Sequence, residues 1–331
     1  MRPFKYSKAI DIGAAVKITT ANQQAQFLAG GTNILDLMKE DVERPNELVD
    51  ITRLQLTKVE RILTGVNIGG VSIGGLGKNT ETANHPLIRK QFPILSQAIL
   101  AGASVQIRNM ATNGGNLNQR TRCPYFYEVS LPCNKREPGS GCGALEGANR
   151  MHAIFGWSDK CVAVHPSDMC VALTALDATV QVQGADGKKR GIPFTDYHRL
   201  PGDTPQKDNN LEQGELVTSI EIPKSNFTKS YYLKVRDRAS YAFALVSVAA
   251  LLETDGANIN EARIALGGVA HKPWRAMEAE KFLAGKAATE ANFRQAAEIE
   301  MKQAKPLQHN EFKIELGIRA ITRALVQAMT T

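Results

Sequence analysis

The segment "QFLAGGTNILDLMKE", from Gln26 to Glu40, combines a short apolar strand, a pair of glycines and a helix. The strand runs directly into Gly30 and Gly31, and the following apolar residues recur at helical spacing, namely Ile34, Leu35, Leu37 and Met38. Backbone amides at such a turn point outward, and the positive end of the helix dipole favours an anion such as a pyrophosphate. Because the GxGxxG spacing of a Rossmann turn is missing, an ordinary tight turn is the simpler explanation of this segment taken alone.

A second glycine pair lies in "TNGGN", from Thr112 to Asn116, where the flanking side chains can hydrogen-bond a phosphate. Taken alone, this segment also fits a simple loop. Two such turns within the first 120 residues indicate a dinucleotide held between two subdomains and not on one βαβ unit. The two turns together therefore point to a flavin and away from nicotinamide.

Hydrophobic periodicity predicts a small α/β unit at the start of the chain, with strand, helix, strand, helix and strand between Lys5 and Asp50. The segment "VNIGGVSIGG", from Val66 to Gly75, alternates apolar and small residues and predicts a pair of strands. Pro93 interrupts a helical segment, and Pro166 with Ser167 marks the start of another helix.

The last third of the chain has a different pattern. After the strand "ELVTSIEIP", three further strands are predicted in "KSYYLKVR", "SYAFALVSVAALLE" and "ARIALGGV". Helical patterns follow in "FRQAAEIEMKQA" and "IELGIRAITRALVQAM". We place a domain boundary between Ile222 and Thr228, which gives domains at 1–225 and 226–331.

Composition sets limits on the class of protein. The chain has 331 residues, of which 43% are hydrophobic, so it can bury a large core. Its longest apolar runs are shorter than the roughly 18 residues needed to span a bilayer, so no membrane span is expected. The net charge of +7 comes from 40 basic residues scattered among 33 acidic ones, which predicts a solvated face and no nucleic-acid partner. The start of the chain lacks the apolar stretch and the twin arginines of an export signal.

The five cysteines crowd into one region, from Cys123 to Cys170. An odd number so clustered is untypical of a disulfide framework and favours a metal. No two of them have the spacing of two to four residues that zinc sites use, whereas an iron–sulfur cluster tolerates wide spacing in a long loop. Cys170 lies in a predicted amphipathic helix, where a buried structural thiol is the ordinary outcome. The predicted ligands are thus Cys123, Cys133, Cys142 and Cys161, with free buried cysteines as the main alternative.

Several long blocks together resemble one family. "FLAGGTNILDLMK", "RNMATNGGNL", "HPSDMCVALTALDA", "ELVTSIEIP" and "KVRDRASYAFALVSVAALL" occur in the order found in FAD-binding subunits of molybdenum hydroxylases, the xanthine dehydrogenase family. The cysteine loop, about 121–163, resembles the loop that binds a [4Fe-4S] cluster in flavin subunits of bacterial periplasmic aldehyde oxidoreductases. The resemblance implies an α+β chain: a two-subdomain FAD-binding fold of the PCMH/vanillyl-alcohol-oxidase type, then an α+β domain like the C-terminal domain of the CO dehydrogenase flavoprotein.

The resemblance also implies cofactor-binding residues. The segment from Gln26 to Ile34 would bind the FAD pyrophosphate from one side, and the second glycine turn, Thr112 to Asn116, would bind it from the other. The full set is Gln26, Phe27, Leu28, Ala29, Gly30, Gly31, Thr32, Asn33, Ile34, Gly102, Thr112, Gly114, Gly115, Asn116, Asp168, Val217 and Lys234. Lys234 would lie beside the flavin ring, where a positive charge stabilises the reduced anion. Gly102 departs from the pattern, because some relatives place an aromatic residue over the flavin there.

As a function, the resemblance implies an electron-transfer subunit of a molybdenum-dependent aldehyde oxidoreductase. Its expected partners are a molybdopterin-binding large subunit, a [2Fe-2S] small subunit and an external electron acceptor. A 4-hydroxybenzoyl-CoA reductase-like or xanthine dehydrogenase-like complex is the runner-up. A self-sufficient flavin oxidase and a zinc-stapled, non-redox interaction protein are the alternatives from other classes. The complex would be periplasmic, exported with a signal-bearing partner, or cytoplasmic.

Overall fold

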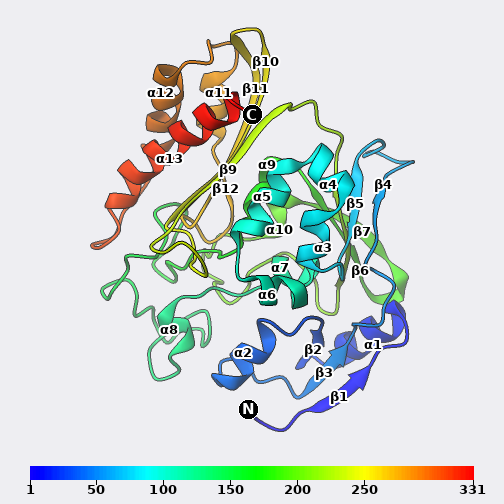
Figure 1. The fold of residues 1–331 in the computed structure, drawn as a ribbon. Coiled ribbons are helices and arrows are strands. Elements are labelled where there is room, and N and C mark those ends of the chain that lie inside the picture. Colours follow the sequence, from blue (N-terminus) through cyan, green and yellow to red (C-terminus); the bar gives the residue numbers. More distant parts are fainter.

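The computed structural model describes residues 1–331, which form three units, each built on one sheet (Figure 1). The N-terminal unit has a parallel sheet in the order β1-β3-β2. Its elements are β1 (Lys5–Lys8), α1 (Ile12–Ala21), β2 (Ala25–Leu28), α2 (Ile34–Lys39) and β3 (Glu47–Asp50). This order confirms the predicted strand–helix alternation, with the two glycines between β2 and α2.

The second unit is built on a five-stranded antiparallel sheet in the order β4-β5-β8-β6-β7. Its strands are β4 (Val59–Arg61), β5 (Val71–Gly74), β6 (Thr179–Gln183), β7 (Lys189–Pro193) and β8 (Leu216–Ile222). Its helices are α3 (Asn79–Asn84), α4 (Pro86–Gln91), α5 (Pro93–Ala101), α6 (Val105–Met110), α7 (Asn113–Leu117), α8 (Pro124–Tyr127), α9 (Asp168–Ala175) and α10 (Phe194–Tyr197). Pro93 separates α4 from α5, and Ser167 caps α9 by accepting from the backbone N–H of Cys170, as predicted.

One strand prediction in this unit was wrong. The segment from Val66 to Gly75 forms only β5, and the strand beside it is β4, which precedes the segment. Gly65 and Gly69 have φ angles of 87° and 83°, a left-handed conformation that turns the chain instead of extending it. The alternation of small and apolar residues did not distinguish this turn from a strand.

The C-terminal unit packs three helices on one face of a four-stranded antiparallel sheet, in the order β12-β11-β10-β9 (Figure 1). Its elements are β9 (Lys229–Val235), β10 (Val246–Asp255), β11 (Asn258–Gly267), β12 (Trp274–Arg275), α11 (Met277–Leu283), α12 (Glu290–Met301) and α13 (Phe312–Met329). No helix of the structure is long and apolar enough to cross a bilayer.

Strand β10 is buried on both faces, which explains its nearly continuous apolar sequence. Val248 and Ala250 belong to the core under α12 and α13, whereas Ala249 and Leu251 belong to the core of the second unit. Neighbouring β9 alternates in the same way, so Lys234 points toward α5 and α9, as Tyr232 does. Side chains of β9 and β10 in the C-terminal sheet therefore form part of the core of the second unit.

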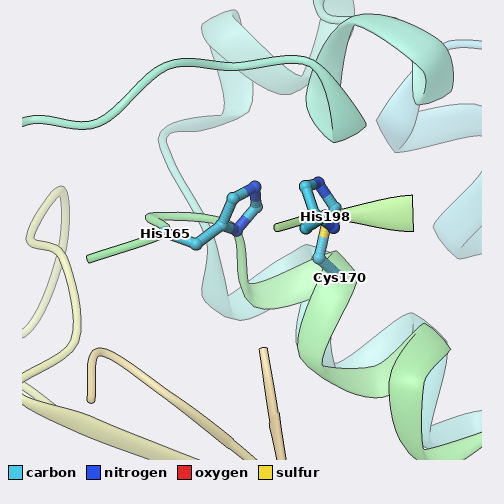
Figure 2. A group of neighbouring side chains, drawn as sticks. All are labelled: His165, Cys170 and His198. Carbon is cyan, nitrogen blue, oxygen red and sulfur yellow. The ribbon is translucent and has the colours of Figure 1, made fainter. Parts of the chain in front are cut away.

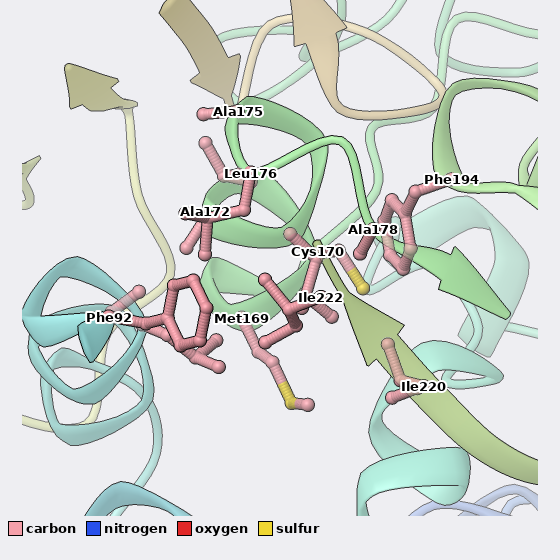
Figure 3. Packing of buried hydrophobic residues seen from close by; sticks show 14 of the residues in the cluster. Phe92, Met169, Cys170, Ala172, Ala175, Leu176, Ala178, Phe194, Ile220 and Ile222 are labelled. Atoms are coloured by element: carbon pink, nitrogen blue, oxygen red, sulfur yellow. The ribbon is translucent and has the colours of Figure 1, made fainter. Parts of the chain in front are cut away.

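The core of the second unit gathers around α9 and β8 (Figure 3). Cys170 lies there among Ile220, Phe194 and other apolar side chains, and it is fully buried. Burial raises the pKa of its thiol to about 12. These observations agree with the interpretation of Cys170 as a structural thiol outside any metal site.

Candidate functional site

The two glycine turns face each other across one cleft, which we call the glycine cleft. It contains about 1290 Å³ of space and is lined by residues of the turn after β2, of α7 and of β8. The predicted residues along it are Gln26, Phe27, Ala29, Gly30, Gly31, Thr32, Asn33, Ile34, Thr112, Gly114, Gly115 and Val217. Leu28, the last residue of β2, is not among the lining residues. The structure thus brings together two segments that are about 80 residues apart in the chain.

Close backbone packing holds the two turns together. A Cβ atom on Gly30 would lie 2.1 Å from the carbonyl oxygen of Met110, at the end of α6, so only glycine fits there. In the second turn, the Thr112 hydroxyl accepts from the backbone N–H of Gly115 at 3.2 Å. The fully buried Asn113 donates to the carbonyl oxygen of Gly74 at 3.0 Å. The backbone of both turns is therefore fixed before any ligand arrives.

Asn33 presents an unused donor to the cleft. The backbone N–H of Arg120 donates to Oδ1 of Asn33 at 2.9 Å, which fixes the orientation of the amide. The Nδ2 atom is buried and has no partner. One nitrogen of the Arg120 guanidinium, which also lines the cleft, is buried without a partner as well. Buried donors of this kind are costly unless a ligand or water accepts from them.

A second chamber of about 1840 Å³ continues from the glycine cleft, and both are lined by Thr32, Asn33 and Gly115. Asp168 and Lys234 lie on its wall, with Nζ of Lys234 donating to the aspartate at 2.7 Å. The Tyr232 hydroxyl donates to the other carboxylate oxygen at 2.7 Å. Predicted residues Gly102 and Asn116 also line this chamber. The cleft and the chamber together form one elongated site, to which the two halves of the chain contribute.

Breaking the ion pair in this chamber is expected to destabilise the protein strongly. Only 4% of the Lys234 side chain and 7% of the Asp168 side chain are exposed, so Lys234→Met leaves a buried carboxylate with a single hydroxyl donor. We expect a loss of about 3 kcal/mol, measured by urea unfolding of FAD-free protein. The double variant Lys234→Met/Asp168→Asn should recover part of this loss, because it removes the uncompensated charge. Equal stability of Lys234→Met and wild type would contradict the prediction.

Gly102, at the position where the resemblance implies an aromatic residue in some relatives, has little free space beside it. A Cβ atom there would lie 3.3 Å from the Asp168 carboxylate. The chamber has two aromatic side chains from another segment, Tyr241 and Phe243, which are both exposed. Sequence analysis missed them, although "SYAF" lies within the block that carries the family resemblance. It also missed Arg122, whose guanidinium donates to Asp36 at 2.9 Å in the same chamber.

The four predicted cysteine ligands line one small cavity, which we call the cysteine cage. Cys123, Cys133, Cys142 and Cys161 all line it. Cys133 and Cys142 pair across an antiparallel bridge, and Cys123 comes to them from the start of α8. Burial raises the pKa of Cys123 to about 12 and that of Cys161 to about 11. Metal ligation would therefore have to displace protons from these thiols.

The loop around the cage is held by side-chain bonds to its own backbone. The Asn134 carboxamide accepts from the backbone N–H groups of Gly139 and Gly141 at 3.0 and 2.9 Å. Arg136 donates to the carbonyl oxygens of Tyr125 and Phe126. These bonds replace regular secondary structure, of which the loop has almost none.

A buried ion network joins the cage to the glycine cleft. Lys135 and Arg120 both pair with Asp208, and Arg120 also pairs with Glu43. Although burial alone would raise it, these two cations hold the pKa of Asp208 well below its usual range. Arg120 lies in "RTRCPY", three residues before the first cage cysteine, but its partner Asp208 is 88 residues away. The network makes the positions of cage and cleft interdependent.

His165, His198 and Cys170 come together beside α9, with ligand atoms within 4.8 Å of one another (Figure 2). His198 Nε2 donates to the carbonyl oxygen of Leu117 at 2.9 Å, so its Nδ1 carries a lone pair. The backbone N–H of Ser167 donates to Nδ1 of His165 at 3.3 Å, which places the hydrogen of that ring on Nε2. The two imidazoles and the thiol therefore form a buried polar cluster with no metal requirement of its own.

Three buried histidines are expected to make the protein less stable in mild acid. Burial lowers the pKa of His198 and His271 to about 4, and that of His165 well below its usual value. In the unfolded chain these histidines take up protons near pH 6.5, whereas in the folded protein they stay neutral. Their contribution to the free energy of unfolding is therefore complete above pH 6.5 and is lost as the pH falls toward 4. The free energy of unfolding should fall by up to about 4 kcal/mol per pH unit below pH 6. Urea unfolding from pH 8 to 5 measures this slope, and a flat profile would contradict it.

Comparison with known proteins identifies the family. Residues 2–225 match the model of the FAD binding domain in molybdopterin dehydrogenase, and residues 231–328 match that of the CO dehydrogenase flavoprotein C-terminal domain. The aldehyde oxidoreductase FAD-binding subunit PaoB of Escherichia coli (strain K12) is 46% identical over 99% of both chains. The glyceraldehyde dehydrogenase medium chain of Sulfolobus acidocaldarius is 31% identical over 86% of this chain and 82% of its own.

Solved structures share the fold. Carbon monoxide dehydrogenase from Oligotropha carboxidovorans gives a TM-score of 0.77, with 24% identity over 100% of this chain and 99% of that chain. Quinoline 2-oxidoreductase from Pseudomonas putida 86 gives 0.75, with 23% identity over 99% and 98%. The chain therefore belongs to the FAD-binding medium subunits of the molybdenum hydroxylase family, and it is an oxidoreductase subunit. This membership confirms the predicted fold class and excludes a non-redox, zinc-stapled protein.

Proposed function

We propose that this chain is the FAD- and [4Fe-4S]-containing electron-transfer subunit of a heterotrimeric, molybdenum-dependent aldehyde oxidoreductase. The observation that carries the proposal is the pairing of one two-part dinucleotide cleft with one cage of four cysteines in the same chain. The 46% identity to an aldehyde oxidoreductase FAD-binding subunit supports aldehyde as the substrate of the complex.

FAD fits the elongated site by the chemistry of its lining. The unpartnered Nδ2 of Asn33 and the free guanidinium nitrogen of Arg120 are donors that a pyrophosphate would accept from. Gly30 and Gly115 leave no room for side chains, so backbone amides are the groups presented. Lys234 and Asp168 would lie beside the flavin ring, in the adjoining chamber. Bound FAD would supply a group that takes up single electrons and gives up two.

A [4Fe-4S] cluster fits the cysteine cage by number and type of ligand, since such clusters are held by four thiolates. His152 lies on the wall between the cage and the flavin chamber, with Nε2 3.1 Å from Sγ of Cys123. One cavity is lined by Cys123 and His152 and also by Asp168 and Phe243, two residues of the chamber wall. Cluster ligation would also fix a loop that has little regular structure of its own.

We further propose that a molybdopterin-binding large subunit oxidises the aldehyde and that a [2Fe-2S] small subunit passes the electrons to FAD in this chain. An external acceptor would then reoxidise the flavin. The complex would be periplasmic, carried by the export signal of a partner, or cytoplasmic. The 1–225 domain would bind FAD and the 226–331 domain would close the site with Lys234.

Anaerobic reduction of the flavin tests this function. The complex isolated with its partners should be yellow-brown, and an aldehyde substrate found by screening should bleach the flavin absorbance near 450 nm (roughly the usual flavin maximum). The chain separated from the molybdenum subunit should keep its flavin but show no bleaching by aldehyde. Bleaching of the isolated chain would instead favour a self-sufficient oxidase, and absence of flavin from the intact complex would refute the proposal.

A further inference from the structure

An open groove lies where the end of β9 meets helix α13, and we call it the arginine groove. It contains about 970 Å³ of space. Its floor is apolar, and its rim carries four arginines from two separate segments. The floor residues are Leu233, Val235, Leu316 and Ala320, and the rim residues are Arg236, Arg238, Arg319 and Arg323.

Positive charge on this rim is largely uncompensated. Lys234 pairs with Asp168, Asp237 with Arg150, and Arg319 with Glu315. Arg236 and Arg238 instead donate to the carbonyl oxygens of Ala101 and Tyr241. Arg323 is exposed and makes no ion pair. Three arginines around an apolar floor thus lack a carboxylate partner.

The groove adjoins the chamber that would hold the flavin ring. Lys234, Asp237 and Arg238 line both the groove and the chamber. Lys234 stands between them, with its ammonium group on the chamber side. The groove and the chamber therefore share a wall at the end of β9.

We propose that the arginine groove docks an acidic protein that accepts electrons from the reduced flavin, one at a time. This inference rests on the proposed function, because it needs FAD in the chamber. For each reduced FAD, held as its anion, two carrier molecules each gain one electron and one proton passes to water. The openness of the groove, its apolar floor and its spread of arginines suit a protein surface, whereas a small anion needs donors that converge in an enclosed pocket.

Binding measurements test the docking surface independently of electron transfer. The probe is oxidised cytochrome b5, an acidic one-electron carrier, and basic cytochrome c is the comparison. The variant Arg319→Gln/Arg323→Gln removes two rim charges, and Lys58→Gln/Arg61→Gln removes two exposed charges at β4, on the opposite side of the molecule (Figure 1). At low ionic strength the rim variant of the native complex should bind cytochrome b5 about tenfold more weakly than wild type. The β4 variant should bind it about as wild type does.

Electron transfer gives the second readout. After reduction of the complex with dithionite, reoxidation by cytochrome b5 should be about tenfold slower in the rim variant, while reoxidation by neutral benzoquinone should be unchanged. Equal losses in the two variants, or binding of cytochrome c as tight as that of cytochrome b5, would overturn the proposal. Loss of partner subunits from the rim variant, seen by size-exclusion chromatography, would overturn it too, because the groove would then be a subunit interface. A complex without flavin would refute the proposed function, whereas the binding comparison would still test the docking surface.

Discussion

Replacing Gly30 with alanine is expected to abolish the binding of FAD. The new Cβ would lie 2.1 Å from the carbonyl oxygen of Met110 and 2.9 Å from its carbonyl carbon. Both are backbone atoms, so no side-chain rotation relieves the clash, and the first glycine turn must move away from the end of α6. Only two residues link α6 to α7, which carries the second turn. Moving the first turn away from α6 therefore also moves it away from the second turn and widens the cleft.

We expect Gly30→Ala to weaken FAD binding by about 100-fold or more, which corresponds to about 2.8 kcal/mol. Flavin released by acid from purified protein measures the occupancy, and a fluorescence titration of the FAD-free protein measures the affinity. The matched control is Gly13→Ala in α1, where the nearest atom, Asp11 Oδ1, lies at an ordinary 3.4 Å. Alanine there should keep full flavin content and favour the helix slightly. A yellow Gly30→Ala protein with normal affinity would show that the turns do not need this close packing.

The second large effect is expected from Cys133→Ala. Cys133 is buried in the cage and pairs with Cys142 across the antiparallel bridge, so its loss removes one of four thiolates and one fixed point of the loop. Anaerobically purified wild-type protein should contain iron and acid-labile sulfide in equal amounts, and Cys133→Ala should retain almost none of either. The loop should also become sensitive to proteases, because little regular structure holds it.

Cys170→Ala is the matched control for the cage. Cys170 is fully buried but lies in the apolar core around α9, outside the cage. Its replacement creates a small cavity and should cost about 1 kcal/mol of stability without loss of iron. Zinc in the wild-type protein, or equal iron in wild type and Cys133→Ala, would contradict the cluster assignment. Loss of iron from Cys170→Ala as well would show that the wrong four cysteines were chosen.

The local features of this site could be predicted from the sequence. The turn after β2 and the turn at α7 were recognisable because glycine pairs between a strand and a helix, or before an amide-rich turn, have few structural uses. The four cage cysteines could be chosen because Cys170 alone lies within a predicted helix; the structure confirms helix α9 but buries it on every side, so its predicted amphipathic character was wrong. Each of these inferences needs only residues that are neighbours in the chain.

Features that depend on distant pairing could not be predicted. Asp168 meets Lys234 across 66 residues, and Arg120 meets Asp208 across 88, so only the packed sheets bring the charges together. The same holds for the arginine groove, whose rim joins the end of β9 to α13. The strand prediction at Val66 to Gly75 failed because alternation alone does not reveal the left-handed glycines that turn the chain.

A crystal structure of the anaerobically purified protein, with diffraction measured on both sides of the iron absorption edge, tests the central claim most directly. That claim is that the glycine cleft and its chamber hold FAD while the cysteine cage holds iron. The prediction is continuous dinucleotide density from the two glycine turns to Lys234, and an iron anomalous peak enclosed by Cys123, Cys133, Cys142 and Cys161. A cleft without a dinucleotide, together with a cage whose cysteines are free, oxidised or bound to zinc, would contradict it.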